Sequence, residues 1–145
     1  MTDMKQIVVG VDGSDTSRAA LQWAYEEAVH HGASLVAVST WHPPVLPMGP
    51  GYGSMPPEGY EGQPEKDARE LLERLTAELE PREPAVDVRI SISKGSPAKV
   101  LIDMSQGADL VVVGSHGRGG FAGMLLGSVS QHVVAHAACP VVVLR

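Results

Sequence analysis

Short apolar runs alternate along the chain with stretches in which apolar residues recur every three or four positions. Such runs are typical of buried β-strands, and such stretches are typical of amphipathic helices. The predicted strands are 7–11, 35–41, 86–92, 109–114 and 140–144, and the predicted helices are 15–31, 65–79, 97–106 and 128–137. This alternation indicates right-handed βαβ units, so we expect an α/β fold with three layers, a doubly wound five-stranded parallel sheet between helices.

Two parts of the chain depart from this regular pattern. Strand 86–92 alternates apolar and polar residues, which predicts one face in water and a position at the edge of the sheet. Residues 42–64 contain seven prolines and five glycines, too many for a helix or a central strand. Because loops of this length are usually functional or disordered, we expect a mobile loop within a single domain that spans 1–145.

Charge and cysteine content narrow the classes of function. The net charge is −6, and basic residues do not cluster, so neither nucleic acid nor an acidic membrane is an expected partner. Cys139 is the single cysteine, which excludes an internal disulfide and a cysteine-based metal site. No segment reaches the roughly 20 apolar residues of a membrane span, and the first residues do not resemble a signal peptide. We therefore expect a cytoplasmic protein.

The clearest chemical signal is the series of glycines around the last helix. The fourth predicted strand ends at Gly114, Gly117 follows, and Gly127 and Ser128 come nine residues later, where a helix begins. Backbone N–H groups in such a turn have no partners and bind anions, which the helix dipole also favours. Ligands of doubly wound sheets bind at the carboxyl ends of strands, where the first strand also ends, at 11–13. The sequence thus predicts a phosphate-bearing ligand, and a nucleotide in particular.

The spacing Gly114-x2-Gly117-x9-Gly127-Ser128 is similar to the G-2x-G-9x-G-[S/T] motif of the ATP-binding branch of the universal stress proteins. The resemblance continues through four further segments, at 7–14, 95–98, 108–114 and 136–143. It implies a Rossmann-like parallel sheet with the strand order 3-2-1-4-5. It also implies a homodimer that pairs through the last strand, 140–144, and a protein partner that the sequence does not identify.

By position, the resemblance assigns ligand contacts to Gly10, Val11, Asp12, Val38, Gly114, Gly117, Arg118, Gly127, Ser128, Val129 and Ser130. Residues 10–12 would border the adenine and ribose, Val38 would contact the adenine, and the glycines and residues 128–130 would hold the phosphates and ribose. Asp12 would accept hydrogen bonds from ribose hydroxyls or meet a phosphate-bound Mg²⁺ through water, so no metal bound directly by the protein is expected. Arg118 would approach a terminal phosphate, or it is a solvated loop arginine.

Three functions fit these residues. The first is an ATP-binding regulatory protein of the universal stress type, in which ATP with Mg²⁺ ties the glycine turn to the end of the first strand and stabilises the fold. The second is a slow ATP hydrolase or nucleotidyl-transfer enzyme, with Asp12 or His116 as base, although the motif lacks a lysine. The third is a dimeric scaffold that binds no nucleotide. We favour the first, with AMP or cyclic AMP left open in place of ATP and no catalytic residue assigned.

Overall fold

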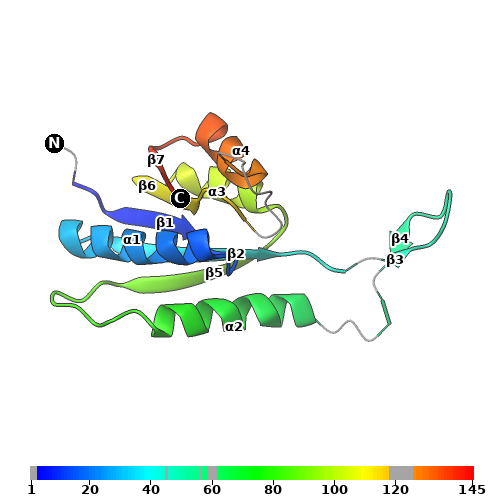
Figure 1. Ribbon diagram of the computed structural model, residues 1–145, viewed down its shortest axis with the longest axis horizontal. Helices are drawn as coiled ribbons and strands as arrows, with labels where there is room; N and C mark the ends of the chain where they lie inside the picture. Colours follow the sequence, from blue (N-terminus) through cyan, green and yellow to red (C-terminus); the bar gives the residue numbers. More distant parts are fainter. Residues whose placement is uncertain (1–2, 45, 56, 59–61, 118–125) are drawn as a thin grey trace.

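A five-stranded parallel sheet forms the centre of the molecule (Figure 1). The structure is a computed structural model that describes residues 3–44, 46–55, 57–58, 62–117 and 126–145. The strands of the sheet are β1 (Gln6–Gly10), β2 (Ser34–Trp41), β5 (Val88–Lys94), β6 (Leu110–Gly114) and β7 (Val141–Leu144). Their order is β5-β2-β1-β6-β7. This is the predicted order 3-2-1-4-5 once a separate two-stranded hairpin is left out of the count, so the predicted fold class is confirmed.

Helices cover both faces of the sheet. They are α1 (Asp15–His31), α2 (Gln63–Ala77), α3 (Pro97–Ser105) and α4 (Ser128–His136). One apolar cluster joins α1 and α2 to the face that carries Ile7 and Val9, and a second joins α3 and α4 to the face that carries Val8. These three residues of β1 are fully buried, so the central strand contributes to both clusters and reads as a continuous apolar run.

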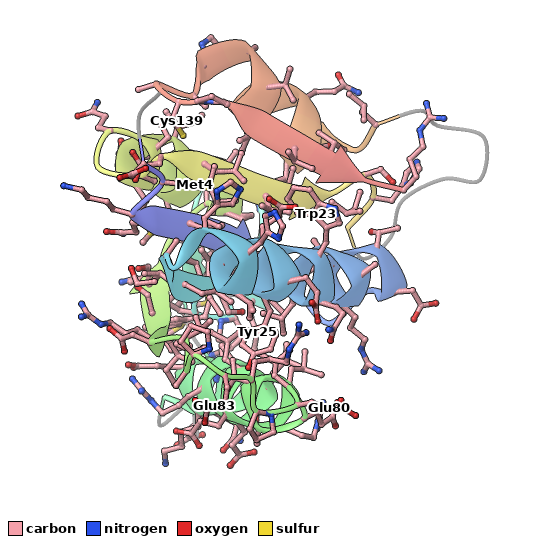
Figure 2. All side chains as sticks on the ribbon, turned by 90° about the vertical axis from the view of Figure 1, so that its left-hand side faces the viewer. Met4, Trp23, Tyr25, Glu80, Glu83 and Cys139 are labelled. Atoms are coloured by element: carbon pink, nitrogen blue, oxygen red, sulfur yellow. The ribbon has the colours of Figure 1, made fainter. Side chains whose placement is uncertain are left out.

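A serine cap and a glycine define the two ends of α1. The Ser14 side chain caps the helix by accepting a hydrogen bond from the Ser17 N–H (3.3 Å), and Gly32 ends it with a φ of 65°. The Tyr25 side chain lies between α1 and α2, where its hydroxyl donates to the Glu80 carbonyl at 2.7 Å (Figure 2). These contacts define the two ends of α1 and join α1 to the segment that follows α2.

The segment expected to be an irregular loop, 42–64, contains more structure than its composition predicts. It holds an antiparallel hairpin of β3 (Leu46–Pro47) and β4 (Ser54–Met55), which lies away from the sheet (Figure 1). We call residues 46–55 the arm. Helix α2 begins at Gln63, two residues before the predicted start, because Pro64 occupies the first helical turn, where the missing N–H of proline has no intrahelical partner to lose.

The two edges of the sheet are half-buried. Among the described residues, strand β5, which was predicted to lie at an edge, pairs only with β2, and the last strand, β7, pairs only with β6. In the part of the chain that the structure describes, no helix combines the length and the apolar character that crossing a membrane requires.

Candidate functional site

The carboxyl ends of β1 and β6 bring two distant segments together. The two strands are paired, so the segment 12–17 after β1 and the turn 115–117 after β6 leave the sheet side by side. The Thr16 hydroxyl donates to the His116 carbonyl at 2.6 Å, across 100 residues of sequence. The predicted convergence of the first-strand terminus and the glycine turn is therefore present.

Asp12 lies at the centre of this junction. Its Oδ1 accepts hydrogen bonds from the Ser14 N–H (2.9 Å) and the Ser14 hydroxyl (2.5 Å), and its own N–H donates to Ser17 Oγ (3.3 Å). A Cβ added at Gly117 would lie 2.8 Å from Asp12 Oδ2. The second carboxylate oxygen thus lies directly beside the exposed motif glycine.

Gly114 is explained by packing within the protein. A Cβ at this position would lie 2.5 Å from Thr16 Oγ1 and 2.8 Å from the backbone nitrogen of Ser17. Real Cβ atoms do not approach backbone so closely, so the first turn of α1 requires a glycine at the end of β6. This requirement holds whether or not a phosphate binds.

Gly127, at the N-cap of α4, closes the other side of the turn. Its N–H donates to the Ser115 carbonyl (2.5 Å), and its φ of −76° is open to any residue. The Ser130 hydroxyl lies within hydrogen-bond distance of two carbonyl oxygens, those of Ser115 (3.1 Å) and Gly127 (3.0 Å). Ser130 is 2% exposed, so its side chain ties α4 to the turn from inside the protein.

The remaining predicted residues differ in how much of them reaches solvent. Gly117 and Ser128 are exposed, whereas Val129 packs partly into the cluster between α3, α4 and the sheet. Val11 and Val38 are brought together by a hydrogen bond from the Val11 N–H to the Val38 carbonyl (2.8 Å). Both valine side chains are buried, so little of the Val38 side chain is open to an adenine.

Gly10 faces α3 rather than the glycine turn. A Cβ there would lie 2.9 Å from Leu101 Cδ1, so glycine makes room for the leucine that anchors α3 on the sheet. Arg118 was predicted to approach a terminal phosphate, and it lies outside the described residues.

Sequence reasoning missed the part that Thr16 and Ser115 play in this site and treated Ser14 only as a helix cap. Thr16 binds the glycine turn from the start of α1, and Ser115 does so through its carbonyl, which accepts from Gly127 and Ser130. The Ser14 hydroxyl donates to Asp12, beside the turn. The available signal was the parallel pairing of the first and fourth strands. It places hydroxyl side chains that open the first helix against the turn after the fourth strand.

Asp109 and Cys139, which lie away from the glycine turn, have shifted pKa values. The backbone N–H groups of Lys5 and Gln6 donate to Asp109 Oδ2 (2.8 and 3.0 Å) and hold the pKa of that carboxyl below its usual value. Burial, and then the charge of Asp109, raise the pKa of the Cys139 thiol, which keeps it protonated at neutral pH.

A surface cavity of about 200 Å³ lies between α1 and α2, away from the glycine turn, and its lining includes Arg18 and Glu78.

The chain is similar to known proteins along almost its whole length. A model of the universal stress protein family matches residues 4–145. A universal stress protein of Mycolicibacterium smegmatis is 43% identical over 141 residues, an alignment that covers 96% of this chain and 45% of that relative. The chain therefore spans less than half the length of this curated relative.

Solved structures agree in fold along the whole chain. The universal stress protein UspA from Lactobacillus plantarum superposes with a TM-score of 0.75 at 26% identity and covers 100% of both chains. A universal stress protein in complex with cAMP superposes with a TM-score of 0.66 at 27% identity, over 99% of this chain and 98% of the other. The latter protein binds an adenine nucleotide on a fold of this kind.

Proposed function

The chain belongs to the universal stress protein family, and we propose that it binds an adenine nucleotide, ATP with Mg²⁺, at the carboxyl ends of β1 and β6. The observation that carries this proposal is the junction at which the Asp12 carboxylate, the exposed Gly117 and the first turn of α4 adjoin one another. A related protein of known structure was solved with cAMP, which supports an adenine nucleotide as the class of ligand.

The phosphates would occupy the exposed side of this junction. The first N–H groups of a helix have no partner within the helix and carry the positive end of its dipole, and in α4 they belong to residues 128–130. The Gly117 nitrogen lies close to Gly127, since a Cβ at Gly127 would be 3.6 Å from it. Asp12 would accept from the ribose hydroxyls or hold the hydrated Mg²⁺. The described junction supplies backbone donors and one carboxylate, a set suited to holding a nucleotide.

Binding of the nucleotide would raise the free energy of unfolding of the protein. A ligand that contacts segment 12–17 and the turn 115–117 binds the folded state alone, so it stabilises that state by about 2.7 kcal/mol at a hundredfold excess over Kd. We propose that this linkage makes the protein a nucleotide-dependent regulator, in which occupancy biases a surface that a partner protein recognises.

A charge introduced at the start of α4 tests the site. Ser128→Asp places a carboxylate at an exposed position where the helix itself tolerates negative charge, so the fold is retained. Repulsion between charges about 4 Å apart near a protein surface is worth about 4 kcal/mol, enough to weaken ATP binding tenfold or more in calorimetry.

The matched control is Val134→Asp, which makes the same change of charge on a residue of α4 that is 52% exposed but lies toward the other end of the helix. It is expected to keep ATP affinity within about twofold of the wild type, a change of roughly 0.4 kcal/mol. ATP binding by Ser128→Asp at wild-type affinity would refute the site.

We also propose that β7 pairs with β7 of a second copy to form a homodimer. Strand β7 is apolar throughout, half-buried and paired on one side only, so its outer edge is a template for another strand. Pro140 and Leu144 turn their carbonyls toward β6, so Val143, which is out of phase with them, directs its N–H outward. Val143→Pro should therefore convert the dimer to a monomer in light scattering, and a mass unchanged from a wild-type dimer would contradict the proposal.

A further inference from the structure

The His116 carbonyl receives its hydrogen bond from Thr16 rather than from Ser14. Thr16 Oγ1 lies 2.6 Å from this oxygen, and Ser14 Oγ lies 3.3 Å from it. A hydroxyl has one proton to donate, and Ser14 Oγ is only 2.5 Å from the Asp12 carboxylate, a charged and much nearer acceptor. The Ser14 proton therefore goes to Asp12, and the Thr16 hydroxyl is the nearer of the two to the His116 carbonyl and the one that donates to it.

The peptide plane transmits this contact to the motif glycine. The carbonyl of His116 and the N–H of Gly117 belong to one planar trans peptide group, so they point in opposite directions. When Thr16 holds the carbonyl toward α1, the Gly117 N–H points away from α1. The Gly117 nitrogen also lies beside Gly127, at the start of α4, where other backbone N–H groups are available to an anion.

The turn needs such a restraint because residue 117 is a glycine. Glycine adopts positive and negative φ with similar ease, so a peptide next to it can invert at small cost. An inverted peptide would present the His116 carbonyl, and thus a partial negative charge, where the phosphate is to bind. One hydrogen bond to that carbonyl biases the two orientations by about tenfold.

We propose that Thr16 is a positioning residue for phosphate recognition: its hydroxyl holds the 116–117 peptide so that the Gly117 N–H faces the nucleotide. Thr16 itself need not touch the ligand, and its effect falls on the phosphates rather than on the nucleoside. This inference rests on the proposed nucleotide site and adds to it a residue outside the glycine motif.

The test compares Thr16→Val, which removes the donor at constant shape, with Thr16→Ser, which keeps the hydroxyl. Calorimetry with ATP should show affinity about five- to tenfold weaker in Thr16→Val and within about twofold of wild type in Thr16→Ser. Binding of adenosine, which has no phosphate, should be the same in all three proteins. The amide resonance of Gly117 in nitrogen-edited NMR spectra should move in Thr16→Val and return in Thr16→Ser, with no ligand present.

Two results would overturn the inference and leave the nucleotide site standing. One is wild-type ATP affinity in Thr16→Val, and the other is an equal loss of ATP and adenosine binding, which would indicate general damage to the site. Failure of the wild-type protein to bind ATP would refute the proposed function itself, together with this inference. Far-ultraviolet circular dichroism of each variant reports whether the fold is intact.

Discussion

The turn after β6 and the arm at 46–55 are both rich in glycine, yet the residue serves a different purpose in each. Gly49, Gly51 and Gly53 of the arm have φ values of 99°, 85° and 73°, and a Cβ on any of them would meet nothing within 4 Å. Gly114, before the turn, has backbone of α1 2.8 Å from where its Cβ would lie. Glycine provides backbone conformation in the arm and room for a neighbouring helix at the turn.

The same contrast extends to the polar and apolar side chains of the two segments. At the turn, hydroxyls of Ser14, Thr16 and Ser130 bond to carbonyls or a carboxylate of the protein itself. The arm instead exposes Tyr52 (80%) and Met48 (50%) to solvent. Glycine content therefore does not by itself identify an anion site, because backbone conformation explains the glycines of the arm and packing against α1 explains Gly114.

Adding a methyl group at Gly114 should lower the free energy of unfolding more than the same change at a glycine of the arm. Gly114→Ala forces the first turn of α1 away from β6, and overpacking of this kind costs about 1–3 kcal/mol. The free energy of unfolding, measured by urea titration with circular dichroism, should fall by about 2 kcal/mol. An alanine variant as stable as the wild type would show that the start of α1 can move freely.

Gly51→Ala in the arm is the matched control for this prediction. Its φ of 85° is strained for alanine, but open space surrounds the position and an isolated two-stranded hairpin is marginally stable, so the arm can relax. The free energy of unfolding should change by about 0.5 kcal/mol or less. A loss as large as that of Gly114→Ala would mean that the arm is part of the cooperative core.

The fold could be predicted because its signals are local. The apolar runs of β1 and β6 and the caps of α1 at Ser14 and Gly32 lie within a few residues of the elements they define. Strand order came from the family resemblance, and the edge position of β5 came from its alternating pattern. The hairpin of the arm was missed because prolines conceal short strands that pair only with each other.

The junction at the ends of β1 and β6 could be predicted in place, but its contacts could not. Parallel topology brings the ends of β1 and β6 together, which the sequence indicates. The reason for a glycine at position 114 could not be seen, because the atoms that exclude a side chain belong to Thr16 and Ser17, nearly 100 residues away. The family resemblance assigned Val38 to the adenine, and only packing shows that its side chain is buried.

We propose that Ser130 and Ser128, both in the first turn of α4, serve different purposes, with Ser130 contributing to stability and Ser128 to nucleotide binding. Ser130→Ala removes a buried hydroxyl, but the Ser115 and Gly127 carbonyls keep N–H donors from Gly127 and Gln131. The loss in free energy of unfolding should therefore be about 1 kcal/mol, near that of one ordinary hydrogen bond. Ser128→Ala, at an exposed position, should change stability by less than about 0.5 kcal/mol and weaken ATP binding instead. Equal stability of the two variants in urea would contradict the view that Ser130 holds α4 on the turn from inside.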